Sequence, residues 1–243
     1  MKTLSFIKSN SLLHQLLAFV YRLTTADGDD IRWITQRPLI NGLLESEPEG
    51  LRLDCGCGLG MYQRKMRQGA SPVMAMDIQE SNLRYCLRGG LITNTAIRGD
   101  TSFLPFTADA FDTVLCSEVI EHIVDDQQAV KELSRVLKPG GRLIISVPVP
   151  PGNIDQDEYG HKREGYTPEG LRALLKEQGL AVQTVDFCFF SWSRRVMQAL
   201  AWHVRYLKIN PLRVILIPVW LERALRINSS PYDMVVLAVK EDR

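Results

Sequence analysis

The sequence predicts an α/β domain whose mostly parallel sheet is covered by helices on both faces. The chain has 243 residues with 45% hydrophobic and 23% charged residues, a composition typical of globular proteins. From residue 51 onward, short apolar segments alternate with helical patterns, and a glycine-rich turn follows the first of these segments. Parallel strands are joined by crossover helices, so this alternation predicts neighbouring parallel strands.

Two helices are expected before the first strand. Apolar residues recur at helical spacing across residues 9–23, and a second helical pattern runs from about Asp29 to Leu44. The turn from Pro48 to Gly50 ends this pattern. We therefore assign residues 1–50 to an N-terminal helical segment.

Seven strands and four helices are expected in the remainder of the chain. The expected strands span residues 51–54, 73–77, 95–98, 113–116, 142–147, 181–187 and 234–239. The expected helices span residues 61–68, 81–88, 125–137 and 168–178. Ser81 can cap the second of these helices, because a serine hydroxyl accepts a hydrogen bond from a first-turn N–H group.

A basic, apolar insertion separates the last two expected strands. Residues 188–230 contain seven basic residues and one acidic residue, together with three of the four tryptophans, Trp192, Trp202 and Trp220. Between residues 194 and 208, apolar and basic side chains occupy different arcs of a helix. The segment is interpreted either as an amphipathic helix on an anionic membrane or as a cap or dimer contact that buries the same residues.

Several classes of protein are disfavoured by composition. Five cysteines at irregular spacing argue against a disulfide framework and for a reducing compartment. Cys55 and Cys57 have no second pair nearby, so no metal ligands are assigned. The net charge of +1 does not indicate a nucleic-acid partner. Without a signal peptide or a long apolar run, we expect a cytoplasmic protein, with peripheral attachment to the inner face of the membrane as the alternative.

The glycine-rich turn, Leu53–Gly60, is the sharpest local signal. Its strand ends in Asp54, and Gly56, Gly58 and Gly60 then alternate before a helix. Glycines permit the positive φ of a tight turn and the close approach of a ligand to the backbone. The dinucleotide fingerprint needs glycine at its sixth place, where this chain has Met61, so a nicotinamide-dependent oxidoreductase is disfavoured.

Three consecutive strands are expected to end in or beside a carboxylate. These are Asp54, Asp77 and Asp100. The carboxyl ends of parallel strands meet at one edge of a sheet, where α/β proteins bind ligands. A carboxylate at the second strand end can accept both hydroxyls of a ribose.

With these features, the chain resembles the class I S-adenosylmethionine-dependent methyltransferases, in the small-molecule group that includes the quinone-biosynthesis methyltransferases. The resemblance covers about residues 51–148 and rests on Leu53–Gly60, Asp77, Arg98–Asp100 with Leu104–Phe106, Ala110–Val114, Glu118–His122 and Leu133–Gly141. It implies a Rossmann-like, seven-stranded sheet with an antiparallel last strand. It also implies one methyltransferase domain over residues 1–243, with residues 51–187 and 231–243 as its cofactor-binding core.

The resemblance assigns roles to individual residues. Asp54 would lie near the ammonium group of S-adenosylmethionine, Asp77 would bind the ribose, and Asp100 would accept from the adenine amino group. The implied cofactor-binding residues are Asp54, Gly56, Gly58, Gly60, Asp77, Ile78, Asp100, Thr101, Ser117 and Glu118. His122 and His161 are candidate bases, with Tyr166 as a weaker candidate for the acceptor side.

The expected function is methyl transfer to a small or lipid-linked acceptor by in-line displacement, with O-methylation favoured. The alternative is a non-catalytic protein of the same fold that serves as a binding or scaffold subunit. Intact Asp54, Asp77 and Asp100 argue against this alternative, because a scaffold needs none of them.

Overall fold

The computed structural model describes residues 29–46, 49–68, 72–92, 95–150, 160–190 and 230–242. The chain forms two compact units, Met1–Thr35 with Phe189–Pro231 and Gln36–Cys188 with Tyr232–Arg243. The second unit contains the candidate site. The helix expected at residues 9–23 and residues 191–229 of the basic insertion lie outside the described residues.

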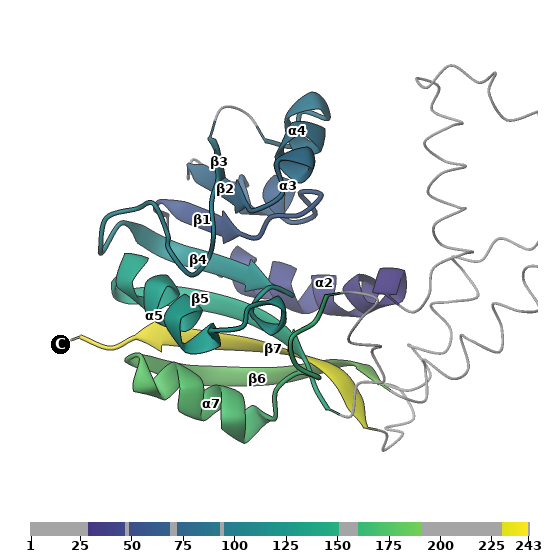
Figure 1. Cartoon of the computed structure of the whole chain (residues 1–243), viewed down its shortest axis with the longest axis vertical. Helices are drawn as coiled ribbons and strands as arrows, with labels where there is room; N and C mark the ends of the chain where they lie inside the picture. Colours follow the sequence, from purple (N-terminus) through teal and green to yellow (C-terminus); the bar gives the residue numbers. More distant parts are fainter. Residues whose placement is uncertain are drawn as a thin grey trace, which may run out of the picture. The chain divides into compact units, whose positions relative to one another are not determined.

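The second unit is organised around one seven-stranded sheet (Figure 1). Its strands are β1 (Arg52–Cys55), β2 (Val73–Asp77), β3 (Ala96–Arg98), β4 (Phe111–Ser117), β5 (Leu137–Pro148), β6 (Leu180–Phe190) and β7 (Pro231–Lys240), in the order β3-β2-β1-β4-β5-β7-β6. The pairs among β1 to β5 are parallel, and β7 runs antiparallel to β5. The expected mostly parallel sheet with an antiparallel last strand is confirmed.

The sheet order predicts that a ligand binds at the carboxyl end of β1. The chain leaves β1 toward β2 and β3 on one side and continues with β4 and β5 on the other. Where the strand order reverses, the two connections diverge and leave a crevice outside the strand ends. The glycine turn after β1 lies at this point.

Helices cover both faces of the sheet because successive strand residues point in opposite directions. The described helices are α2 (Asp29–Glu45), α3 (Gln63–Met66), α4 (Glu80–Arg88), the 3-10 helix η1 (Ile120–His122), α5 (Asp126–Val136) and α7 (Pro168–Glu177). On β4, Val114 and Cys116 share a core with residues of α5 and α7. Leu115 between them joins a second core with Ile40 and Leu44 of α2.

Two sequence-based expectations about helices need correction. The helix expected at residues 61–68 is reduced to the four residues of α3. The expected Ser81 cap is wrong, because α4 begins at Glu80 with Gln79 at its N-cap. The carboxylate of Asp77 accepts the Gln79 N–H at 2.8 Å, so the strand end itself fixes the start of the helix.

Two further features concern the cysteines and the apolar character of the described helices. All five cysteines are buried and free. Among the helices in the described part of the chain, none combines the length and the apolar character needed to cross a bilayer.

Candidate functional site

The turn after β1 is built on three glycines with positive φ. The φ angles are +76° at Gly56, +50° at Gly58 and +75° at Gly60. An added Cβ would lie 2.3 Å from Val119 Cγ2 at Gly56 and 2.9 Å from Cys86 Sγ at Gly60, whereas at Gly58 it would meet nothing within 4 Å. Gly56 and Gly60 thus let the turn pack closely, and Gly58 leaves one side of the backbone open to a ligand.

Asp77 holds this turn against the end of β2. Its buried carboxylate accepts hydrogen bonds from the backbone N–H groups of Gly58 and Gln79, each at 2.8 Å. The side-chain amide of Asn82 donates to the same carboxylate at 3.2 Å. Asp77 therefore connects the glycine turn to the start of α4, at the strand end where a ribose is expected.

Asp54 is a buried carboxyl group at the end of β1. It is 3% exposed, and Gln63 of α3 donates a hydrogen bond to its Oδ2 at 2.5 Å. Burial raises the pKa of Asp54 to about 7; the Gln63 bond lowers it and the nearby Asp77 raises it. A cation bound here would favour the ionised carboxylate. Gln63 was not predicted, because no local pattern distinguishes it from the other polar residues of this segment.

Without ligand, the Asp54 pKa predicts that the protein loses stability as pH rises. The folded carboxyl holds its proton up to about pH 7, whereas the unfolded carboxyl releases it near 3.8. The folded state therefore binds more protons between these values, so its stability contribution is full below the lower value and is lost as pH rises through the upper one. Relative to Asp54→Asn, the wild-type free energy of unfolding should fall by about 4 kcal/mol between pH 4 and 8.

Urea denaturation of both proteins at several pH values measures this difference. If the free energy of unfolding of wild type minus that of Asp54→Asn stays constant with pH, the assigned pKa is contradicted. If this difference instead rises with pH, folding favours the ionised form of Asp54.

The end of β4 is tied to helix α2 through Gln36. The Gln36 amide nitrogen donates to Glu118 Oε1 at 2.9 Å. Its oxygen accepts from the hydroxyls of Tyr62 at 3.1 Å and Ser117 at 3.3 Å. Glu118 itself has a φ of +55°, and its N–H donates to the Ser146 carbonyl at 3.0 Å. Gln36 was not predicted, since no motif distinguishes it from the other polar residues of α2.

The end of β3 presents a carboxylate beside exposed apolar side chains. Asp100 Oδ1 accepts the Ser102 N–H at 2.8 Å, and Thr101 next to it is buried. Ile78, just after β2, is 60% exposed, and Phe103 is 72% exposed. Phe103 was not among the expected residues. A flat ring with polar edges, such as a purine, suits this combination of apolar surface and hydrogen-bond acceptor.

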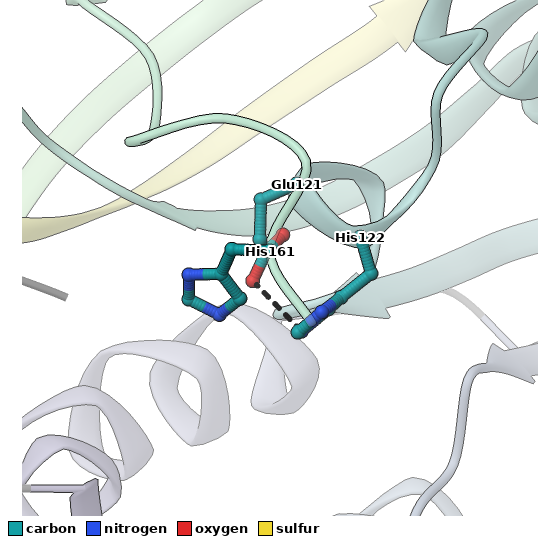
Figure 2. Close-up of side chains that lie close together, drawn as sticks. All are labelled: Glu121, His122 and His161. Atoms are coloured by element: carbon teal, nitrogen blue, oxygen red, sulfur yellow. Dashed lines mark ion pairs between the residues drawn. The ribbon is translucent and has the colours of Figure 1, made fainter. Parts of the chain in front are cut away.

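Two histidines that are 39 positions apart in the sequence meet just beyond β4. The ring centroids of His122 and His161 are 4.4 Å apart, with 70° between the ring planes. Glu121 Oε1 lies 3.8 Å from His122 Nε2. Glu121 is fully buried and His161 is 8% exposed, whereas the His122 side chain is 38% exposed. Figure 2 shows the carboxylate between the two rings in this view.

Backbone hydrogen bonds hold the segment that carries His161. The Lys162 N–H donates to the Glu121 carbonyl at 2.8 Å, and the Tyr166 N–H donates to the Pro148 carbonyl at 2.8 Å. The Tyr166 hydroxyl donates to Asp126 at 2.8 Å. Burial, followed by this bond to Asp126, raises the pKa of Tyr166, so its hydroxyl keeps its proton at neutral pH. His122 and His161 are therefore in contact, whereas the Tyr166 hydroxyl is hydrogen-bonded to Asp126.

Comparison with known proteins agrees with this arrangement. Residues 53–145 match the family described as "Methyltransferase domain". The chain is 32% identical over 204 residues to the demethylmenaquinone methyltransferase of Thermus thermophilus, covering 71% of this chain and 88% of that protein. It is 30% identical over 173 residues to the ubiquinone biosynthesis O-methyltransferase of Caulobacter vibrioides, covering 59% of this chain and 64% of that relative, which is less than two thirds of its length.

A solved structure shares the fold. Phosphoethanolamine N-methyltransferase 2 of Haemonchus contortus, in complex with S-adenosyl-L-methionine, superposes with a TM-score of 0.63 at 16% identity, covering 98% of this chain and 61% of that one. At this identity the likeness concerns the fold alone.

The sheet order, the glycine turn and the acidic strand ends are typical of α/β proteins that bind a nucleoside-containing cofactor at the switch point of the sheet. The chain belongs to the class I S-adenosylmethionine-dependent methyltransferases, as the sequence resemblance implied. The site fits the family's cofactor, because an ammonium group would compensate the charge of the buried Asp54 carboxylate and the Gly58 backbone is open.

Proposed function

We propose that this protein transfers the methyl group of S-adenosylmethionine to a hydroxyl oxygen of a small or lipid-linked acceptor. The observation that carries the proposal is the cluster of Glu121, His122 and His161 directly beyond β4. It follows Ser117 and Glu118, which the family resemblance assigns to the cofactor. Groups that can remove a proton therefore lie next to the expected position of transfer.

The reaction explains why such a cluster is useful. S-adenosylmethionine supplies an electrophilic methyl group on a sulfonium. A new C–O bond forms as the S–C bond breaks, the electron pair of that bond stays on sulfur, and the hydroxyl proton leaves. No protein nucleophile is needed, and orientation of the reactants can contribute on the order of 7–11 kcal/mol. A hydroxyl acceptor must lose its proton, whereas a carboxylate acceptor arrives ionised, so the cluster favours a hydroxyl.

The remaining residues are proposed to bind the cofactor. Asp54 takes the ammonium group, Asp77 the ribose hydroxyls, and Asp100 with Thr101 the adenine, against which Ile78 packs. The supporting observations are their common position at the carboxyl ends of β1, β2 and β3 and the open backbone at Gly58. Ser117 and Glu118 line the path toward the cluster.

An acceptor panel with methyl-labelled S-adenosylmethionine tests the proposal. Phenols, catechols and aliphatic alcohols are compared with carboxylates and amines of matched size, each with and without a lipid tail and anionic vesicles. We expect label in methyl ethers of the hydroxyl acceptors. Label confined to carboxylates or amines would overturn hydroxyl methylation.

The catalytic cluster is tested with His161→Ala. This variant should lower kcat by about 100-fold or more, which is typical for loss of acid–base assistance, while S-adenosylmethionine binding stays near wild type. The exposed Glu169 of α7 provides a control, and Glu169→Gln should leave kcat unchanged. Equal kcat in wild type and His161→Ala would contradict a role for the cluster in proton removal.

A further inference from the structure

The cluster of Glu121, His122 and His161 carries a second property besides basicity. Its three side chains each offer one donor atom, and these atoms lie within 4.8 Å of one another. Two donors are imidazole nitrogens and one is a carboxylate oxygen. They come from two separate segments, η1 and the loop before α7, which converge on one point (Figure 2).

The donor atoms are close enough for side-chain rotation to bring them around one ion. A metal held at about 2.0–2.2 Å from nitrogen and oxygen donors separates neighbouring donors by roughly 3–3.5 Å. Glu121 Oε1 and His122 Nε2 are 3.8 Å apart, too far for a hydrogen bond and close to this ligand spacing. The two rings meet edge to face at 70°, so neither is stacked on the other. The three donor atoms lie within 4.8 Å of one another, which is wider than this spacing, so rotation of the side chains is needed to bring all three to one centre.

The backbone around the cluster is already held in place. The Lys162 N–H bonds the Glu121 carbonyl, so the residues next to His161 and His122 are joined directly. Arg163 donates to the carbonyls of Ile123 at 2.7 Å and Val124 at 3.0 Å. An ion binding here would need little rearrangement of the chain, which favours affinity.

One side of the cluster is open. Glu121 and His161 are buried, whereas the His122 side chain is 38% exposed. Three protein ligands with a remaining open position are the arrangement of catalytic metal sites, and two histidines with one glutamate are a known set for zinc. Nitrogen donors favour zinc and its transition-metal neighbours over magnesium and calcium, which prefer oxygen ligands.

We propose that Glu121, His122 and His161 bind one divalent transition-metal ion of the zinc type, whose open position takes the acceptor hydroxyl. This inference rests on the proposed hydroxyl methylation and states how the proton is removed. The ion lowers the pKa of the bound hydroxyl, the proton passes to solvent, and the resulting oxyanion forms the C–O bond as the S–C bond of the sulfonium breaks. No oxidation state changes.

Metal titration of the full chain tests the site without acceptor. After treatment with a chelator, the protein is titrated with Zn²⁺ by calorimetry and with Co²⁺ by visible absorption, which reports the coordination of the ion. We expect one ion per chain. Glu121→Gln and His161→Ala should each weaken binding by about 100-fold or more, since loss of even an outer-shell partner costs 10–100-fold. Glu169→Gln should bind like wild type.

Two further readouts separate failure of this inference from failure of the proposed function. S-adenosylmethionine binding and the far-ultraviolet circular dichroism of both variants should match wild type. Folded wild type that binds S-adenosylmethionine but no ion, or variants that bind the ion like wild type, would overturn the metal site and leave imidazole as the base. If metal-loaded protein fails to methylate every hydroxyl acceptor, the proposed function is overturned and the ion site stands.

Discussion

Asp77→Ala is expected to weaken S-adenosylmethionine binding by about 100-fold or more. Two effects combine, because the residue is proposed to accept both ribose hydroxyls and is seen to accept the N–H groups of Gly58 and Gln79. Hydrogen bonds to a charged group contribute about 1.5–3 kcal/mol each, and 1.4 kcal/mol corresponds to tenfold in affinity. Calorimetry with S-adenosylmethionine and S-adenosylhomocysteine measures the change.

Two variants control this experiment. Asp77→Asn keeps the shape of the side chain and one acceptor oxygen, so it should lose less affinity than Asp77→Ala. Asp186→Ala removes an exposed carboxylate from β6, distant from β2 in the strand order, and should bind like wild type. Wild-type affinity in Asp77→Ala would show that the ribose binds elsewhere.

Gly56→Ala is expected to destabilise the protein by about 2–5 kcal/mol and to abolish cofactor binding. The φ of +76° costs a residue with a Cβ roughly 1–2 kcal/mol. The new Cβ would also lie 2.3 Å from Val119 Cγ2, and overpacking costs about 1–3 kcal/mol. Relief of this contact must move either the glycine turn or the residues after β4, so one half of the site is displaced relative to the other. Urea denaturation and calorimetry measure the two effects.

The backbone and packing contributions can be separated. Gly140 also has a positive φ, +72°, but an added Cβ there meets nothing within 4 Å. Gly140→Ala should therefore cost only the backbone strain and keep cofactor affinity. Adding Val119→Ala to Gly56→Ala should restore part of the stability. Equal stability losses in Gly56→Ala and Gly140→Ala would mean that the contact with Val119 is unimportant.

The fold could be predicted from local patterns, because each strand and helix depends on residues close in sequence. Alternation of apolar strands and amphipathic helices implied the parallel sheet, and the structure confirms it. The start of α4 could not be predicted, since it depends on the Asp77 carboxylate rather than on the Ser81 hydroxyl. The region 191–229 lies outside the described residues, so the membrane and cap interpretations of the insertion stay predictions.

The site was predictable only in part, because some of its residues are placed by tertiary contacts rather than by the local sequence. Residues at strand ends follow from the topology, so Asp54, Asp77 and Asp100 could be named. Gln36 and Gln63 contact the site through tertiary packing, which the local sequence pattern does not predict. His122 and His161 were named separately, but their contact depends on the hydrogen-bonded loop before α7, which no local pattern encodes.

A crystal structure of the protein with S-adenosylhomocysteine would locate the cofactor and its sulfur relative to the carboxyl ends of β1 and β2. We expect the ribose on Asp77, the amino acid end at Asp54 and the glycine turn, and the sulfur facing the cluster of Glu121, His122 and His161. A ligand bound away from the carboxyl ends of β1 and β2 would contradict the assigned cofactor site. A ligand bound there with its sulfur facing away from the cluster would contradict the assigned position of methyl transfer.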